Sequence, residues 1–434
     1  MNITSTLCVG IDVSLDANQV CAMNFDQHKF FNKSFENSFE GTQQLIKEIA
    51  QIITLHGFDA VTFALEATSL YFFHIANSLS NAEELKLFHV EVYCLNAKVA
   101  KKYKDSFLGM PKNDPLDAYS LCDFVRVGRT KKLHQWRGAN HIALQRLTRH
   151  RYHIALQLAR EKNYVLNNIY LKFSQLRKKQ GKMDSDNPFS DLFGATSSAV
   201  LTDFASIDDI VSMPMEDLVD YIDLKGKHRF TDPKKVATLL RQCAMNSYRL
   251  DKVSYDAINI SIASSLRMIK MLEREIKDLD KQIENFAKGL HSNAYTVLLS
   301  LPGIGPVFAA GILAEIGSID CFPNQNKLAK YIGLIWDDHS SGKLVSEDNK
   351  LMVTGNAFLR YYITQAANKF KDKDSQYHEF YTRKYNEALT HKHKRALVLT
   401  SRKFVKLIYA MLRREQLYSA TGEVLYIRSE ERRV

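Results

Sequence analysis

Two aspartates, Asp114 and Asp117, stand three residues apart at what the sequence predicts to be the start of a helix. Asp114 has the side chain of a good N-cap, and Pro115 would fall at the first helical position, where its missing N–H costs no hydrogen bond. A spacing of three places both carboxylates on one helix face, one turn apart. Taken alone, the pair is most simply explained as capping, because acids in the first turn also complement the helix dipole.

Two further acids lie near the ends of apolar strands upstream of this helix. Asp12 comes late in the β-branched run at residues 7–13, and Glu66 follows the apolar run at residues 60–65. A carboxylate at the end of a buried strand is costly without a partner. If the two strands are neighbours, their ends meet the helix start. The sequence then predicts one cluster made of Asp12, Glu66, Asp114 and Asp117.

Such a cluster has a specific chemistry. Four carboxylates in one place repel one another, and each would have its pKa raised unless a cation holds them. Oxygen ligands of this kind suit Mg²⁺ or Mn²⁺, and two such ions can clamp both oxygens of an in-line phosphoryl transfer. The four acids are therefore candidate metal ligands and candidate catalytic residues. Any one of them alone would pass for an ordinary strand-end or capping carboxylate.

The composition favours a nucleic-acid partner. The chain has 434 residues and a net charge of +11, with an isoelectric point near 9.1, which favours a polyanion. Six scattered cysteines without a Cys-x-x-Cys pair argue against a zinc site and for a reducing compartment. The first residues do not resemble a signal peptide. Glycines and prolines interrupt the uncharged stretch from Val297 to Ala314, so it predicts two short helices and no membrane span.

Alternating strands and helices must position the acids. Helical periodicity at residues 39–55 and 70–79 separates the strand-like runs, and a basic connection at residues 98–112 precedes the helix that opens at Asp114. This alternation predicts an α/β layer over roughly residues 1–135. The predicted strands are 7–13, 18–25, 29–35, 60–65 and 88–94.

A basic helix is expected at residues 139–182. The segment has ten Lys or Arg against one acid, Glu161, and a heptad-like apolar seam interrupted by Arg151. That imbalance favours contact with phosphates over a solvated face. The candidate nucleic-acid contacts are Arg146, Arg149 and Arg151.

A polar linker at residues 183–196 and a small helical module at 197–247 separate this helix from a second long one at 250–290. Ile269, Leu272, Ile276 and the apolar residues after them repeat at spacings of three and four, which is a coiled-coil seam. Its partner could be the first long helix or another subunit.

Two features of the C-terminal half concern nucleic acid. The run Leu301-Pro302-Gly303-Ile304-Gly305-Pro306 predicts the turn of a helix–hairpin–helix, in which Gly303 and Gly305 let the backbone approach a phosphate; a plain helical turn is the alternative. Residues 391–414 carry eight Lys or Arg and no acid, a second phosphate-binding surface. Its candidate contacts are Lys394, Arg395, Arg402 and Lys403. By composition alone, Ser340-Ser341-Gly342 indicates a flexible loop rather than a nucleophile.

With these residues in hand, the chain resembles the DEDD-type insertion-sequence transposases, described as bridge-RNA-guided serine recombinases. Each motif that carries the resemblance is weak alone, but together they occur in the family's order. They are Gly10-Ile11-Asp12, Leu65-Glu66-Ala67-Thr68, Asp114-x-x-Asp117-Ala118, Pro302-Gly303-Ile304-Gly305, Gly333-Leu334, Ser341-Gly342, Gly355-Asn356 and Leu359-Arg360. Ser69, Asn113 and Ile335-Trp336 depart from the family pattern.

The resemblance implies an architecture. It predicts a RuvC-like, RNase H-type α/β domain at residues 1–137 and a helical coiled-coil region at 138–290, with the inserted module at about 183–247. A mostly α-helical transposase domain with the helix–hairpin–helix would follow at 291–415, and a tail at 416–434.

The resemblance also implies an activity. Ser341, with Ser340 as the neighbouring alternative, would form a serine–DNA phosphoester, beside Mg²⁺ (or Mn²⁺) at the acidic cluster. The implied partners are DNA at the element ends and target, a structured guide RNA and further copies of the chain in a dimer or tetramer, with no membrane, in a prokaryotic cytoplasm near the nucleoid. Two alternatives stay open: a RuvC-like nuclease of the junction-resolvase type that uses water, and a non-catalytic nucleic-acid-binding protein.

Overall fold

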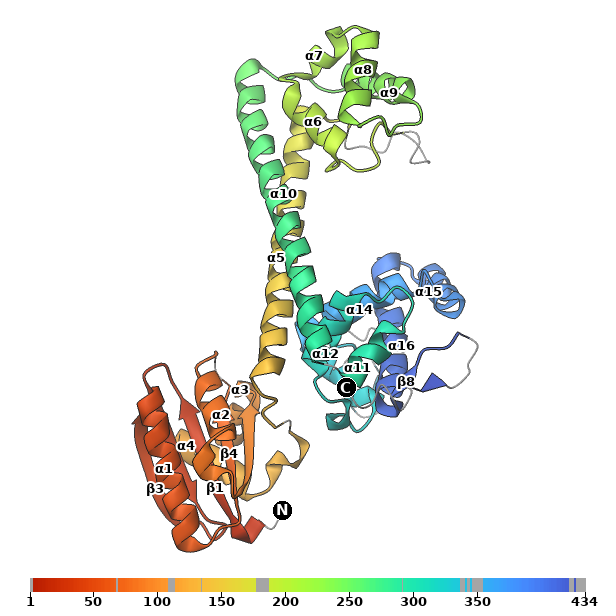
Figure 1. Cartoon of the computed structure of the whole chain (residues 1–434). Helices are drawn as coiled ribbons and strands as arrows, with labels where there is room; N and C mark the ends of the chain where they lie inside the picture. The colour runs from red at the N-terminus through yellow and green to blue at the C-terminus, as the bar shows by residue number, and fades with distance from the viewer. Residues whose placement is uncertain are drawn as a thin grey trace. The chain divides into compact units, whose positions relative to one another are not determined.

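The computed structural model in Figure 1 describes residues 3–67, 69–107, 114–133, 135–176, 187–290, 292–335, 340–341, 344–345, 354–420 and 425–426. The chain divides into two compact units. The first joins Met1–Arg146 to His291–Val434, and the second is Leu147–Leu290. An N-terminal mixed α/β sheet domain is followed by a mostly helical region, as the sequence predicts. No helix in the described part of the chain is both long and apolar enough to cross a membrane.

The sheet has five strands in the order β3-β2-β1-β4-β5. β1 (Thr6–Val13), β2 (Ala17–Met23) and β3 (Lys29–Glu36) form an antiparallel meander. β4 (Ala60–Glu66) and β5 (His89–Leu95) continue the sheet in parallel with β1. All five predicted strands are present within two residues of their expected ends, and β1 and β4 are neighbours.

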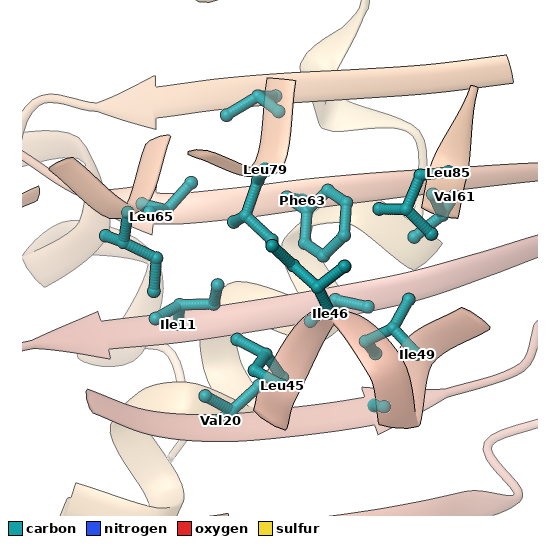
Figure 2. Packing of buried hydrophobic residues seen from close by; sticks show 14 of the residues in the cluster. Ile11, Val20, Leu45, Ile46, Ile49, Val61, Phe63, Leu65, Leu79 and Leu85 are labelled. Carbon is teal, nitrogen blue, oxygen red and sulfur yellow. The ribbon is translucent and has the colours of Figure 1, made fainter. Parts of the chain in front are cut away.

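One face of the sheet is covered by α1 (Phe39–His56) and α2 (Phe72–Ser80). Because side chains alternate along a strand, every second residue of β1 and β4 points to this face. Figure 2 shows the resulting packing of Ile11 and Phe63 against Ile46 and Leu79. The apolar residues that β1 and β4 contribute are Leu7, Val9, Ile11, Val13, Val61, Phe63 and Leu65.

The opposite face is covered by α3 (Ala97–Lys104) and α4 (Asp114–Arg126). The sequence predicts only a basic connection where α3 lies; Asn96 caps this helix by accepting a hydrogen bond from the Lys98 backbone N–H. Gly10 of β1 lets α4 approach closely, since a Cβ at this position would lie 2.2 Å from both Ala118 O and Cys122 N.

The second unit is built on two long helices, α5 (Ala139–Lys172), which begins in the first unit, and α10 (Lys252–Gly289). The basic segment predicted as a helix to residue 182 is helical only to Lys172, and residues 177–186 lie outside the described part. Between the two helices come α6 (Ala195–Asp203), α7 (Ile207–Ser212), α8 (Met215–Lys225) and α9 (Pro233–Met245).

α5 and α10 run antiparallel, side by side (Figure 1). Moving along α5 from Arg151 to Asn168, the hydrogen-bond partners on α10 run backwards from Asp280 to Ser261. Ile262, Leu266 and Ile269 of α10 are buried with Val165 and Ile169 of α5 in one core. The partner of the second long helix is thus the first long helix.

The C-terminal part of the first unit is helical. Its buried side chains include Tyr362 and Phe370 of α14 and Phe404 of α16. The helices are α11 (Asn293–Leu299), α12 (Pro306–Ile316), α13 (Gln325–Ile332), α14 (Ala357–Phe370), α15 (Ser375–Glu387) and α16 (Lys392–Arg414). Two short hairpins, β6 (Ser340–Ser341) with β7 (Leu344–Val345) and β8 (Gln416–Leu417) with β9 (Leu425–Tyr426), complete it. Single 3₁₀ turns lie at Ile3–Ser5, Glu83–Leu85, Arg129–Lys132 and Ile319–Cys321.

Candidate acidic active site

The alternation of β1 and β4 places Asp12 and Glu66 on the face that α4 covers. Asp12 follows Ile11, and Glu66 follows Leu65, and these two apolar residues are partners in the parallel pairing of β1 with β4. Ile11 and Leu65 point to the opposite face, into the core with α1 and α2. Asp12 and Glu66 therefore lie beside each other at the carboxyl ends of neighbouring parallel strands.

The first turn of α4 brings the other two acids to this face. α4 begins at Asp114 itself, whereas a helix capped by Asp114 would begin at Pro115. Asp117 lies in the same first turn. Asn32 of β3 fixes the turn by donating a hydrogen bond to Pro115 O at 2.9 Å, and it accepts one from Gln19 Nε2 at 2.8 Å. Asp114 is exposed and Asp117 is half-buried.

The electrostatics connect all four acids. The pKa of Asp12 is raised to about 6, first by burial and then by the negative charges of Asp117, Glu66 and Asp114. Lys104 acts in the opposite direction and lowers this pKa. Burial alone raises the pKa of a carboxyl group, but the three carboxylates can add to this rise only because they lie close to Asp12. Residues from three separate elements, predicted to meet, are thus brought into one electrostatic environment.

The residues present fit a metal site by their chemistry. The side chain of Asp117 pairs with Lys104 through Oδ2, while its Oδ1 is buried and accepts no hydrogen bond from the described residues. Within those residues, no three His, Cys, Asp or Glu side chains lie close enough to hold one ion as they stand. An unsatisfied buried carboxylate oxygen amid four acids is the kind of donor that a hard cation satisfies.

The predicted nucleophile lies on a short hairpin. Ser340 and Ser341 form β6 and pair with Val345 and Leu344 of β7. The side chains of both serines lie outside the described part of the chain, as do Gly342 and Lys343. The flanking Gly333 ends α13 in a left-handed conformation, with φ of 80°. Asn356 caps α14 through its side chain and also donates to Glu315 at 2.7 Å.

The glycine-containing turn lies between α11 and α12. Gly303 has φ of 81°, and a Cβ at this position would lie 3.4 Å from Lys369 O of α14 and from Lys373 Cγ, just beyond that helix. Gly305 is the N-cap of α12, Pro306 follows at its first position, and a Cβ at Gly305 would contact nothing within 4 Å. Two helices joined by a turn are present as expected. Their identity as a nucleic-acid-binding helix–hairpin–helix stays a prediction.

The three arginines predicted to contact nucleic acid on α5 differ in their surroundings. Arg151 makes a two-point ion pair with Asp280 of α10, with Nε to Oδ1 at 2.7 Å and Nη2 to Oδ2 at 3.3 Å. The arginine that interrupts the seam therefore has a partner inside the hairpin. Arg146 is exposed and Arg149 is half-buried, and contact of either with a phosphate stays a prediction.

The second basic surface contains aromatic rings that sequence reasoning missed. Lys403 of α16 lies over the rings of Tyr377 and Phe380 of α15, at 4.3 and 5.0 Å from their centroids. Lys394 and Arg395 are exposed at the start of α16, whereas Arg402 donates to Asn326 and has its pKa lowered by burial. The sequence feature that could have predicted aromatic rings on this surface is the spacing of Tyr377, Tyr381 and Tyr385 at every fourth residue.

Comparison with known proteins gives matches in both halves of the chain. A family model described as "Transposase", of the DEDD type, matches residues 9–173, and a second, described as "Transposase IS116/IS110/IS902 family", matches residues 295–382. The first covers Asp12, Glu66, Asp114 and Asp117, and the second covers Ser340 and Ser341.

Three curated relatives are similar over part of their length. An insertion element IS116 uncharacterized 44.8 kDa protein of Streptomyces clavuligerus is 26% identical over 35% of this chain and 37% of its own length. An insertion element IS110 uncharacterized 43.6 kDa protein of Streptomyces coelicolor is 28% identical over 38% and 39%, respectively. A transposase for insertion sequence element IS1111A of Coxiella burnetii is 24% identical over 42% and 54%. The chain thus spans about a third to a half of the length of these relatives.

Proposed function

We propose that this chain, which belongs to the IS110/IS116 family of DEDD transposases, is the transposase of an insertion sequence and cuts and rejoins DNA. The observation that carries the proposal is the placement of four acids on one face of the sheet by β1, β4 and the first turn of α4, where burial and the other three acids raise the pKa of Asp12. Fold stability gains nothing from such crowding. A site for phosphoryl transfer requires it.

The cluster would hold Mg²⁺ or Mn²⁺ through Asp12, Glu66, Asp114 and Asp117. When bound, these ions supply Lewis-acid stabilisation of the negative charge that develops on the phosphate. The chain itself contributes the rigid placement: β1 and β4 fix two acids, and Asn32 fixes the turn of α4 that carries the others. A mixed five-stranded sheet with this placement of acids supports a RuvC-like, RNase H-type domain over residues 1–137.

Ser341 would be the nucleophile. Its hydroxyl oxygen would bond to the phosphorus of one DNA strand while a deoxyribose oxygen leaves and takes up a proton. The phosphodiester is exchanged for a phosphoserine ester, so a second DNA hydroxyl can reverse the step without an external energy source. From the resemblance to the family, we propose a composite site in which the acids of one subunit act beside the serine of another, in a dimer or tetramer.

Nucleic acid would be held by the basic surfaces. These are Arg146 and Arg149 on α5, the turn at Gly303 and Gly305, and the start of α16 with Lys394 and Arg395. Their ligands would be DNA at the element ends and target, and a structured guide RNA that selects these sites by base pairing. The protein would act in a prokaryotic cytoplasm, at the nucleoid.

A covalent-adduct assay tests the proposal. The chain is expressed with its native flanking DNA, mixed with Mg²⁺ and labelled element-junction DNA, denatured, and analysed for DNA that migrates with protein. We expect an adduct that is lost in Ser341→Ala and retained in Ser340→Ala, a matched neighbour. Asp114→Asn should reduce the adduct by roughly 100-fold or more, because a missing metal ligand removes several kcal/mol of transition-state stabilisation.

The controls separate the alternatives. Asp16→Asn removes an exposed acid of the same domain and should leave the adduct unchanged. Cleaved DNA without an adduct would replace the serine mechanism with a nuclease that uses water. DNA binding with neither product, in a preparation that contains the co-purified RNA, would contradict the enzymatic proposal.

A further inference from the structure

Lys104 is a basic side chain in direct contact with the acidic cluster. It is the last residue of α3, and its ammonium pairs with Oδ2 of Asp117 in the first turn of α4. The side chains of the pair are 25% and 21% exposed, so water screens them only in part. The neighbouring Lys101 and Lys102 are exposed on the same helix.

The influence of Lys104 extends beyond its partner. Among the groups that act on Asp12, three carboxylates raise its pKa and Lys104 lowers it. One ammonium therefore offsets part of the repulsion within a cluster of four acids. The other oxygen of Asp117, Oδ1, accepts no hydrogen bond from the described residues, so the cluster still has an unsatisfied buried acceptor.

We infer that Lys104 is the internal counter-ion of the acidic cluster and competes with the divalent metal for Asp117. Without metal, its ammonium holds the start of α4 to the end of α3 and limits carboxylate repulsion. A divalent ion on the unsatisfied Oδ1 of Asp117 would repel the ammonium on Oδ2 and so weaken the pair with Lys104. This inference rests on the proposed metal site and adds a residue that sets how readily the site fills.

The displaced ammonium has a second role in this arrangement. Lys104 ends α3 beside the cluster, and under the proposed function the scissile phosphate would lie close to the same carboxylates. A lysine released from Asp117 is a free cation beside that phosphate and would bind one of its oxygens. The same side chain thus stabilises the empty site and, after metal entry, would position the DNA strand.

The test uses the full-length chain and measures Mn²⁺ affinity by electron paramagnetic resonance, with Lys102→Ala as the matched control. Both variants remove one positive charge from α3, but only Lys104→Ala removes the counter-ion. We expect Lys104→Ala to bind Mn²⁺ roughly threefold to tenfold more tightly than Lys102→Ala, the range expected for a partly exposed ion pair. In EDTA, Lys104→Ala should unfold at a lower temperature than Lys102→Ala, and Mn²⁺ should narrow this difference. Lys104→Arg should resemble the wild type.

A double variant keeps the inference testable if Lys104→Ala folds poorly. Adding Asp117→Asn removes the excess negative charge, so the loss of Lys104 should then cost no stability in EDTA. Equal or weaker Mn²⁺ binding by Lys104→Ala than by Lys102→Ala would overturn the competition. A wild-type chain that binds no Mn²⁺ would instead overturn the proposed metal site itself, and this inference with it.

Discussion

Acidic side chains have opposite surroundings in two regions of the molecule. They pair with cations in the helical hairpin of α5 and α10, and they cluster together in the sheet domain. In the hairpin, Asp280 pairs with Arg151 at 2.7 Å, and Glu273 pairs with Lys162 at 2.6 Å. In the sheet domain, three acids surround Asp12 with Lys104 as their nearby cation, and the pKa of Asp12 rises to about 6.

The difference shows which charges serve the fold. An ion pair across two helices fixes their register and costs little, because each charge has a partner. Clustered acids without equal positive charge lower stability, since their mutual repulsion disfavours the folded state. A fold retains such crowding where a ligand is meant to supply the missing charge. Substitutions in both regions test this distinction.

Gly10→Ala should have the largest effect, because it acts on the contact that brings the acids together. The new Cβ would lie 2.2 Å from backbone atoms of Ala118 and Cys122, so α4 must move off the sheet. We expect the sheet domain to lose about 3 kcal/mol or more of unfolding free energy. Urea unfolding and hydrogen exchange in α4 measure it.

The control for this variant is Gly289→Ala, at the end of α10. A Cβ there would contact nothing within 4 Å, and the backbone has no positive φ. This substitution should be neutral or stabilise by up to about 1 kcal/mol. If Gly10→Ala were as mild as the control, α4 would not be held against β1 as described.

Lys172→Met tests a buried cation of the second unit whose hydrogen-bond acceptors are neutral groups instead of an acid. Lys172 is 2% exposed, and its ammonium donates to Leu201 O and Phe204 O at the end of α6 and to Asn259 of α10. Methionine fills the same space but leaves two carbonyl oxygens without this donor. We expect a loss of about 2 kcal/mol, measured by urea unfolding at pH 7.

The same residue predicts a pH dependence. Burial lowers the pKa of Lys172 from 10.5 to about 8. Between these values the unfolded chain binds a proton that the folded chain does not, so folding is disfavoured as the pH falls through this window. The stability of the wild type relative to Lys172→Met should therefore rise from pH 8 to pH 10.5 and be constant below about pH 7. If this stability difference did not change with pH, the buried lysine would not lose its proton at a lower pH than a lysine in the unfolded chain.

Asp12→Asn and Asp280→Asn form a matched pair that tests the distinction directly. Removing Asp12 relieves repulsion, so the metal-free protein should gain about 1 kcal/mol at pH 7 while losing activity. Removing the Asp280 charge breaks the ion pair with Arg151 and should cost about 1 kcal/mol. Thermal unfolding in EDTA measures both. Destabilisation by both substitutions would mean that the cluster is already neutralised without metal.

Glu273→Gln should have the smallest effect. The side chains of Glu273 and Lys162 are 45% and 30% exposed, so solvent and salt screen this pair strongly. We expect a loss of no more than about 0.5 kcal/mol in low salt and none in 1 M NaCl, measured by urea unfolding. A larger loss that persists in high salt would assign Glu273 a packing role.

Sequence patterns were sufficient to predict the strands of the sheet and the approach of the four acids to one another. The apolar runs at residues 7–13 and 60–65 have period two, so the position of Asp12 and Glu66 relative to the core follows from counting. The start of α4 near Asp114 follows from a capping aspartate and the proline after it, which is tolerated in the first turn of a helix. These features depend on local sequence, and the order β1–β4 then brings them together.

Other features depend on contacts that local patterns do not encode. The short helix α3 has mostly Lys on its exposed face and only Ala100 buried, so it carries little apolar periodicity. The pair between Lys104 and Asp117 joins residues across a loop and could not be distinguished from general basic charge. The partner of α10 was undetermined because an apolar stripe fits another copy of the chain as well as α5. The side chains of Ser340 and Ser341 lie outside the described residues, so their role stays a prediction.

The antiparallel register of α5 and α10 has an architectural consequence. The hydrogen-bond partners on α10 occur in reverse order along α5, so the two helices are antiparallel. The chain therefore enters the second unit after Arg146 and leaves it before His291 at the same end of the hairpin. The unit is therefore an insertion with adjacent entry and exit points. Insertions of this geometry can be lengthened or shortened at their far end, as by the α6–α9 module, without changing the spacing of the residues that flank them.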